Sequence, residues 1–142
     1  MPKKIKIRVI LDTNLWISFL ISKRLKVINN LFNREAITLI FSQELLDEFI
    51  EVAQRPKFKK YFSITDLERL LTLFDTYGEL VTVISTVDIC RDEKDNFLLA
   101  LAKDSRANYL ITGDEDLLII KKFEDTEIVS YTQFEVYANE WS

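Results

Sequence analysis

The sequence contains no histidine, one cysteine, two glycines and two prolines among its 142 residues. Without histidine, neither a Ser-His-Asp or Cys-His catalytic unit nor a His-ligated zinc site can form. The lone Cys90 cannot make an intrachain disulfide or a cysteine-based zinc site. Gly78 and Gly113 lie too far apart for a G-x-G-x-x-G turn or a P-loop. Any catalysis must therefore use carboxylates, hydroxyls, amines or a bound ion.

A long hydrophobic run is also missing. No apolar stretch approaches the roughly 18 to 20 residues that a membrane span needs, and residues 1–10 alternate basic with apolar side chains instead of forming a signal-peptide core. We therefore expect a cytoplasmic protein without a membrane segment. Because 48% of the residues are apolar and no repeat or linker interrupts them, residues 1–142 are expected to form one domain with a sizeable core.

Charge is unevenly distributed along the chain. The formal net charge of −4 argues against binding nucleic acid over the whole surface. The first 34 residues nevertheless hold eight basic residues and a single acid, Asp12. That isolated acid directly follows an apolar segment, residues 5–11, which has the composition of a buried strand. We therefore consider a specific role for Asp12.

Hydrophobic periodicity predicts strands that alternate with helices. Strands are expected at residues 5–11, 36–41, 80–84 and 109–112, and around Ile128 and Val129. Helices are expected over 13–32 with a break near Ser22, over 43–54 after the N-cap Ser42, from Ser63 or Thr65 to a left-handed cap at Gly78, over 96–106, and from about Thr132. This order predicts an α/β fold with a small, mostly parallel sheet and helices on both faces.

Two of the predicted strands end in acids. Asp12 follows the first strand, and the sequence T-G-D-E-D, which contains Asp114 and Asp116, follows the strand at 109–112. In open α/β sheets, ligands bind beyond the carboxyl ends of the strands. Each acid also has a structural interpretation, because Asp12 is suited to cap the next helix and Asp114 is suited to a turn. Neither interpretation explains why both strands end in acids.

Two predicted helices supply further acids. Projected at about 100° per residue, Glu48 lies on the rim of the apolar face of its helix, whereas Asp47 lies on the opposite side. Asp95 opens the most apolar helix, where a helix-capping role is equally plausible. Asp92 is expected in the preceding loop, either as a solvated turn residue or as an additional ligand. A solvated surface glutamate is the structural alternative for Glu48.

A divalent cation would reconcile these acids. If Asp12, Glu48, Asp95 and Asp114 converge, four like charges could not all remain ionised without a counterion. Carboxylate oxygens suit Mg²⁺ or Mn²⁺, and an ion held by few side chains keeps water molecules whose pKa is lowered. For a chain without histidine, this is the most economical route to hydrolysis.

Four segments together resemble the PIN domain in order and spacing. They are V-I-L-D-T-N (9–14), E-L-L-D-E-F (44–49), R-D-E-K-D-N-F-L-L-A-L-A (91–102) and Y-L-I-T-G-D-E-D-L (109–117). The likeness covers nearly the whole chain and is greatest to the prokaryotic group regarded as toxins of toxin-antitoxin systems. It implies a Mg²⁺- or Mn²⁺-dependent ribonuclease with a small parallel sheet and an acidic pocket.

The resemblance also assigns roles to particular residues. It places the four principal acids on Asp12, Glu48, Asp95 and Asp114, with Asp116 as an auxiliary ligand. Polar positions that often line the pocket fall on Asn14 and Thr112. The chain departs from the pattern at Asn96, where close relatives often carry another aspartate, so the auxiliary ligands stay open.

The basic segment R-P-K-F-K-K-Y (55–61) is the candidate RNA-binding surface. Arg55, Lys57, Lys59 and Lys60 could contact phosphates, and its two aromatic residues could stack on unpaired bases. The alternative is a solvated connector whose aromatics fold into the core. We also expect a homodimer that binds an antitoxin segment across the cleft. This expectation rests on the resemblance and on the many large apolar side chains of the predicted helices, here called the apolar load. The residues of that apolar load are Trp16, Phe19, Leu20, Phe32, Leu70, Leu71 and Phe74.

Three other functions are consistent with the residues. The chain could be an RNA-processing nuclease with no toxin role, or an inactive PIN-like binding module that needs no metal. A phosphoaspartyl phosphatase could also begin at Asp12, although such enzymes usually carry a second aspartate where this chain has Asn14. Metal-dependent cleavage of RNA would exclude the binding module and the phosphatase.

Overall fold

The computed structural model describes residues 6–22, 37–61 and 63–140. Within these residues, six strands form one sheet in the order β3-β2-β1-β4-β6-β5. Every pairing is parallel except the pairing of β5 with β6. The strands are β1 (Ile7–Leu11), β2 (Ile37–Phe41), β3 (Gly78–Leu80), β4 (Tyr109–Ile111), β5 (Lys122–Phe123) and β6 (Thr126–Val129). The prediction of a mostly parallel sheet is confirmed.

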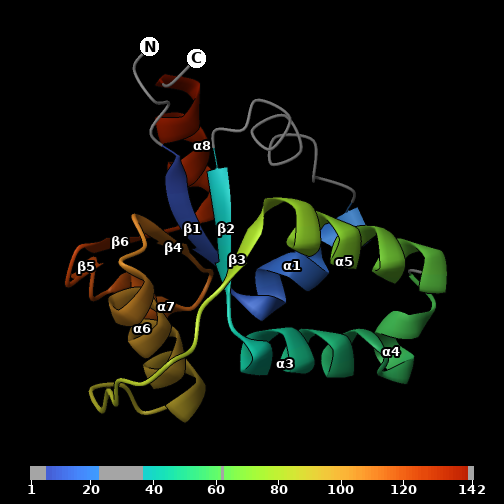
Figure 1. Ribbon diagram of the computed structural model, residues 1–142, viewed down its shortest axis with the longest axis horizontal. Helices are drawn as coiled ribbons and strands as arrows, with labels where there is room; N and C mark the ends of the chain where they lie inside the picture. Colours follow the sequence, from blue (N-terminus) through green and yellow to red (C-terminus); the bar gives the residue numbers. More distant parts are fainter. Residues whose placement is uncertain (1–5, 23–36, 62, 141–142) are drawn as a thin grey trace.

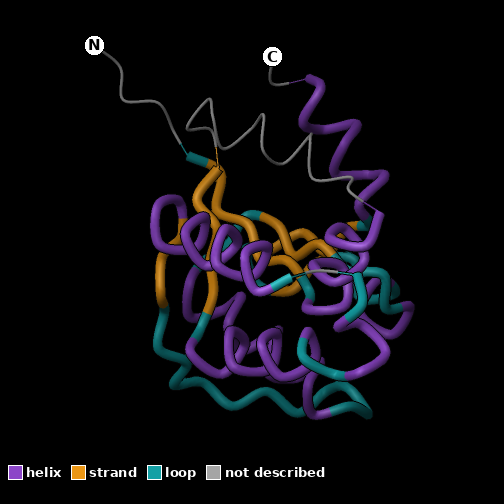
Figure 2. The backbone as a smooth tube through the Cα atoms, turned by 90° about the vertical axis from the view of Figure 1, so that its right-hand side faces the viewer, coloured by secondary structure: helices purple, strands orange, loops and turns teal. Residues whose placement is uncertain are grey.

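Helices cover both faces of this sheet (Figures 1 and 2). They are α1 (Thr13–Ser22), α3 (Gln43–Ala53), α4 (Pro56–Lys59), α5 (Ile64–Tyr77), α6 (Glu93–Ser105), α7 (Glu115–Leu118) and α8 (Tyr131–Glu140). Side chains that alternate along β1 serve two cores, because Val9 packs with residues of α1, α5 and α8, whereas Ile10 packs with residues of α6 and α7. Helix α3 contributes to both cores. The described residues therefore form a single α/β domain.

The predicted starts of two helices are confirmed in detail. Ser42 caps α3, and its Oγ accepts a hydrogen bond from the Leu45 backbone N–H at 3.1 Å. Ser63 caps α5 through a capping box with Asp66, which decides between the two expected starting points. No helix in the described part of the chain is long and apolar enough to cross a membrane.

The region around Gly78 corrects two predictions. Gly78 caps α5 with φ −99°, so the expected left-handed cap is wrong. A side chain is excluded by a close approach instead, because a Cβ atom would clash with the Phe74 carbonyl oxygen and lie 2.6 Å from Phe41 Cε1. The strand expected at 80–84 is Gly78–Leu80 instead: these three residues lie in register with Leu39–Phe41 of β2, and the Val81 backbone N–H makes one further bond to the Phe41 carbonyl.

Other element boundaries also differ from the predictions. Helix α6 begins at Glu93, not near residue 96, because Asp92 caps it; Asp92 itself lies in the preceding loop, as expected, in an extended conformation. Pro56 follows α3 as expected but also opens the short helix α4. The antiparallel strand β5 was not predicted, since two residues carry no periodicity. The second half of the helical region 13–32 lies outside the described residues.

Candidate active site

Three helices begin on the side of the sheet where the parallel strands end, and each helix has an aspartate at its start. Asp12 precedes α1, Asp92 caps α6 and Asp114 caps α7. In each case a carboxylate oxygen accepts a hydrogen bond from the backbone N–H two residues later, at 2.9 to 3.1 Å. Because β1 and β4 are parallel neighbours in register, with Leu11 opposite Ile111, the acids that follow them are brought together. The aspartates therefore bond the starts of helices, and those that follow β1 and β4 also lie close to one another.

Asp12 is held by bonds to both of its carboxylate oxygens. Oδ1 accepts from the backbone N–H of Asn14, and Oδ2 accepts from the Thr112 hydroxyl at 2.8 Å. The Thr112 hydroxyl also accepts from the Asp114 backbone N–H at 3.0 Å, so it links the two strand ends. Thr112 is fully buried behind Asp12. The expectation that Thr112 lines the pocket is therefore wrong, and it positions Asp12 instead.

Asp95 lies in the first turn of α6 and is only 4% exposed. Its Oδ2 atom is buried and has no hydrogen-bond partner among the described residues. The pKa of Asp95 is raised from its ordinary 3.8 to about 7, first by burial and then by the hydrogen bond with the Asp114 carboxyl and the negative charges of Asp114, Asp92 and Asp12. The environment thus opposes a lone negative charge and favours an added cation at this position.

Asp95, Asp114 and Asp116 form the tightest group of acids. One carboxylate oxygen of each lies within 4.8 Å of the corresponding atoms of the other two, a spacing that could hold a metal ion. Arg91 Nη2 donates to both carboxylate oxygens of Asp116, at 3.0 and 2.9 Å. Asp116 is therefore shared between this group and an exposed arginine.

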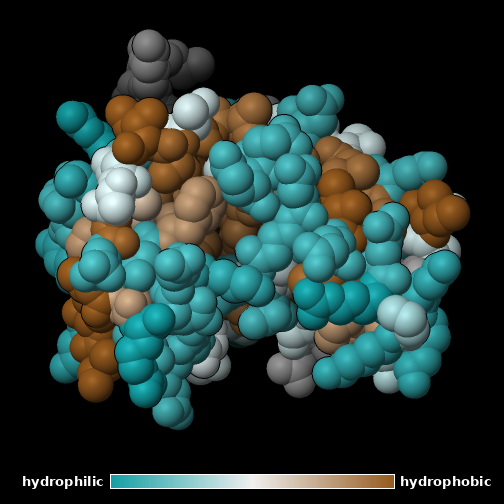
Figure 3. All heavy atoms as spheres, turned by 90° about the horizontal axis from the view of Figure 1, so that it is seen from below, coloured by the Kyte–Doolittle hydropathy of each residue, from teal (hydrophilic) through white to brown (hydrophobic). Residues whose placement is uncertain are grey.

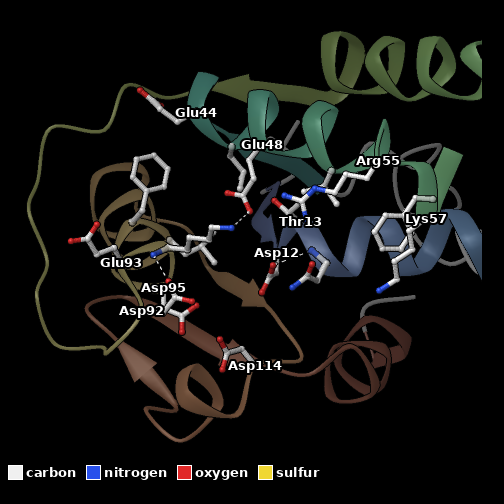
Figure 4. Close-up of a pocket in the computed structure, with 17 residues that line it drawn as sticks. Asp12, Thr13, Glu44, Glu48, Arg55, Lys57, Asp92, Glu93, Asp95 and Asp114 are labelled. Atoms are coloured by element: carbon white, nitrogen blue, oxygen red, sulfur yellow. Dashed lines mark hydrogen bonds and ion pairs between the residues drawn. The ribbon is translucent and has the colours of Figure 1, made fainter.

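Glu48 reaches the same cleft from the opposite wall (Figure 4). It lies on α3, its side chain is 33% exposed, and its Oε1 atom is 3.7 Å from Lys94 Nζ on α6. Asp47 is exposed and bonds Gln43 on its own helix, as the helical projection predicted. Neither Glu48 nor Asp12 belongs to this group of three acids, although both line the same cavity.

A cavity of about 630 Å³ joins these residues. Asp12, Asn14, Glu48, Asp95 and Asp114 all line it, together with Asp92. Figure 4 shows the labelled acids around the cavity, and Figure 3 shows a largely hydrophilic surface across the middle of the face seen from below. The four principal predicted acids thus lie around one cleft.

The basic segment divides into two parts. Arg55, Lys57 and Phe58 line the cavity, whereas Lys59 and Lys60 do not. Phe58 is partly buried against the core, as the structural alternative expected, while Tyr61 is 49% exposed with Lys60 Nζ over its ring. Arg55 also forms an ion pair with Glu51 at 3.4 Å. The structure places two cations and one aromatic side chain beside the acids.

Sequence reasoning missed three residues of this region. Lys94 lines the cavity, Arg91 bonds Asp116, and the buried Thr13 hydroxyl in the cavity wall has no hydrogen-bond partner in the described part of the chain. A lysine in the first turn of a helix is unfavourable for the helix dipole, and this signal could have drawn attention to Lys94. Nothing in the local sequence distinguishes Thr13 from an ordinary helix-start residue.

The chain belongs to the PIN domain family, whose pattern matches residues 8–116. The matched region contains the six acids of the candidate site, namely Asp12, Glu48, Asp92, Asp95, Asp114 and Asp116. The chain is also similar to a protein of Methanocaldococcus jannaschii, Uncharacterized protein MJ1680, with 33% identity over 123 residues that cover 84% of this chain and 78% of that protein. PIN domains are generally nucleases, so this chain has a nuclease-type fold with an acidic cluster at its cleft.

Proposed function

We propose that this protein is a divalent-metal-dependent endoribonuclease that cleaves single-stranded RNA. The observation that carries the proposal is the buried Asp95 Oδ2 atom, which lacks a partner among the described residues and lies in a group with Asp114 and Asp116. A buried carboxylate oxygen without a partner is costly, and a cation would satisfy it. The proposal assigns Asp12, Glu48, Asp95 and Asp114 as the catalytic and metal-binding residues.

These residues fit Mg²⁺ or Mn²⁺. All the donors are hard carboxylate oxygens, which such ions prefer, and the lack of histidine removes softer competitors. When bound, the ion would activate a water molecule for attack on phosphorus and neutralise developing charge. Asp12, Glu48, Asp95 and Asp114 would hold it, and Asp116 and Asp92 are auxiliary candidates. Thr112 would keep Asp12 aimed into the cavity.

RNA is the substrate that the cavity wall supports. Arg55 and Lys57 stand beside the acids, where they would bind phosphates on one side of the scissile bond. The ring of Phe58, with Lys57 Nζ 5.2 Å from its centre, offers a partial stacking surface. Lys59 and Lys60 would act farther along the strand, because they lie outside the cavity lining.

Cleavage of a labelled single-stranded RNA tests the function. We expect cleavage with Mg²⁺ or Mn²⁺ and none with excess chelator. Because no histidine can drive attack by the ribose 2′-hydroxyl, the products should carry 5′-phosphate and 3′-hydroxyl ends. Cyclic 2′,3′-phosphate ends, or full activity in chelator, would contradict the mechanism. RNA binding without cleavage would favour the inactive binding module.

A toxin role with an antitoxin partner is a further part of the proposal, supported only by the resemblance. A small adjacent reading frame that encodes a DNA-binding protein would support it, and its absence would favour RNA processing without a toxin role. The homodimer is proposed on the same ground. The apolar load that suggested it is partly explained by the core, since Trp16, Leu70 and Phe74 are buried there. A strictly monomeric mass by light scattering at micromolar concentrations would contradict the homodimer.

A further inference from the structure

Lys94 lies at the boundary between two hollows of the surface. It lines the cavity that holds the principal acids, and it also lines a shallow hollow beside that cavity, together with Arg91 and Asp116. Within the described residues, it is the cation common to both hollows. An RNA strand that runs past the acids and continues beyond the start of α6 would therefore pass Lys94.

Stability does not explain a lysine at this place. Lys94 is the second residue of α6, where a positive charge opposes the helix dipole and acids such as Glu93 and Asp95 are favoured. Its ion pair with Glu48 is long, at 3.7 Å, and its side chain is 66% exposed. Exposed pairs of this kind contribute little to folding. The position therefore calls for a functional reason.

The ion pair spans the cavity. Glu48 comes from α3 and Lys94 from α6, and the dashed line across the cleft in Figure 4 ends at Glu48. Arg55 and Lys57 lie toward the α3–α4 end of the same cavity. Cations thus stand at two separate parts of the wall, with the acids between them. This arrangement suits a chain of phosphates that extends in both directions from the acids.

We propose that Lys94 is a substrate-binding residue whose Nζ contacts a phosphate of single-stranded RNA and pairs with Glu48 when no RNA is bound. The proposal rests on the nuclease function proposed above and deepens it. A lysine ammonium binds phosphate oxygens as a point charge, so it can exchange a carboxylate partner for a phosphate without a fixed geometry. With Arg55 and Lys57 on the other side, the cleft would bind an internal phosphodiester bond rather than a strand end.

The variant Lys94→Met removes the charge and keeps the apolar stem. We expect its affinity for a short labelled single-stranded RNA to fall about tenfold, because one charge-assisted contact is lost. The slope of log affinity against log salt should become shallower by about 0.7, as expected for one phosphate contact fewer. Both are measured by fluorescence anisotropy with Ca²⁺ in place of Mg²⁺ or Mn²⁺, on RNA checked for integrity afterwards.

Two further measurements separate substrate binding from a structural role. Mn²⁺ affinity, measured by titration without RNA, should stay level or increase in Lys94→Met, because a positive charge beside the acids is gone. The melting temperature should stay level or rise, because the helix dipole is relieved. Lys94→Arg should recover most of the RNA affinity. The matched control is Lys103→Met, an exposed lysine on the same helix outside both hollows, and it should leave RNA affinity and the salt slope unchanged.

Several outcomes would overturn the proposal. Equal RNA affinities for Lys94→Met and Lys103→Met would show that Lys94 makes no phosphate contact. A lower melting temperature with weaker Mn²⁺ binding in Lys94→Met would show that the lysine only orients Glu48. If the wild-type protein neither binds nor cleaves RNA, the nuclease function itself fails, and the role of Lys94 fails with it. If the wild type cleaves RNA and Lys94→Met matches it, only the role of Lys94 fails.

Discussion

Two adjacent buried residues in the first turn of α6, Asp95 and Asn96, differ in whether their polar side-chain atoms have hydrogen-bond partners. On the cleft side, Asp95 has a buried carboxylate oxygen without a partner among the described residues. On the other side, Asn96 Oδ1 accepts from the backbone N–H groups of Ile89 and Cys90 at 3.1 and 2.8 Å, and Nδ2 donates to the Cys90 carbonyl at 3.0 Å. The two residues are adjacent and almost equally buried, at 4% and 8% exposure.

This difference separates residues that serve folding from residues that serve a ligand. Asn96 fixes the chain that leads into α6, because its side chain bonds the backbone of Ile89 and Cys90. An aspartate at this position would lose the bond to the Cys90 carbonyl. Asp95 has a buried Oδ2 atom without a partner among the described residues, and this unsatisfied oxygen is a cost that a bound cation would remove. Asp92, at the start of the same helix, is a cap that could serve either purpose.

The largest effect is expected for the cleft-side acids. Asp95→Asn should lower metal-dependent RNA cleavage at least about a hundredfold, because one ligand charge is lost where the reaction develops charge. Asp12→Asn, Glu48→Gln and Asp114→Asn should act alike. The control is Asp47→Asn, which neighbours Glu48 but bonds Gln43 outside the cavity and should retain nearly full cleavage. Cleavage retained in Asp95→Asn would show that this side of α6 is not the catalytic one.

The stability of the metal-free protein should depend on pH through Asp95. Its pKa is raised from the ordinary 3.8 to about 7 in the folded state, so between these values the folded protein binds a proton that the unfolded chain has released. Folding is therefore favoured at low pH, and this contribution is lost as pH rises toward about 7. Glu79 and Asp104 have lowered pKa values and remain ionised above pH 5, so they do not change over this range.

Thermal melts in chelator at pH 5 and pH 7.5 test this expectation. The wild-type melting temperature should be lower at pH 7.5, and Asp95→Asn should show a smaller difference between the two conditions. Mn²⁺ added at pH 7.5 should raise the melting temperature of the wild type more than that of the variant, because the ion binds the ionised site of the folded state. Parallel pH profiles for the two proteins would assign the titration to other groups.

On the folding side of the turn, Asn96→Asp should destabilise the protein by about 1 to 3 kcal/mol, since the Cys90 carbonyl loses its donor and faces a negative charge. Denaturant unfolding measures this cost. Asn108→Asp is the matched control, because Asn108 uses its side-chain oxygen to accept from the Arg8 N–H and an aspartate keeps that acceptor. A stable Asn96→Asp protein with tighter Mn²⁺ binding would show instead that position 96 belongs to the metal site.

The fold could be predicted from the sequence where patterns are long or chemically explicit. The alternation at residues 5–11, the Ser42 cap and the apolar face of α3 predicted their elements correctly, because burial and capping follow from a few neighbouring residues. The start of α6 was placed three residues late, since the polar stretch before residue 96 hides a first turn that Asp92 caps. Gly78 was misread because the need for glycine arises from contact with Phe41, which is distant in sequence.

The candidate site followed from strand order more than from any single residue. Two strands that end in acids, and a helix with Glu48 on its rim, suggested that the acids could converge, and the family resemblance implied one acidic pocket. The sequence could not show that Thr112 lies behind Asp12 or that Lys94 reaches Glu48, because both contacts depend on how separate elements pack. The roles of the gathered acids, and the extent of one domain over residues 1–142, stay predictions.

Asp92 provides the smallest and most discriminating comparison. As a cap only, Asp92→Ala should cost about 1 kcal/mol of folding free energy, because the Lys94 backbone N–H loses its acceptor, whereas Asp92→Asn should cost little, since asparagine caps helices equally well. Cleavage should then stay close to normal in Asp92→Asn. Asp95 should show the reverse pattern, with folding retained in Asp95→Asn and cleavage lost. Loss of cleavage in a stable Asp92→Asn protein would move Asp92 to the ligand side of the comparison, because only its charge would have changed.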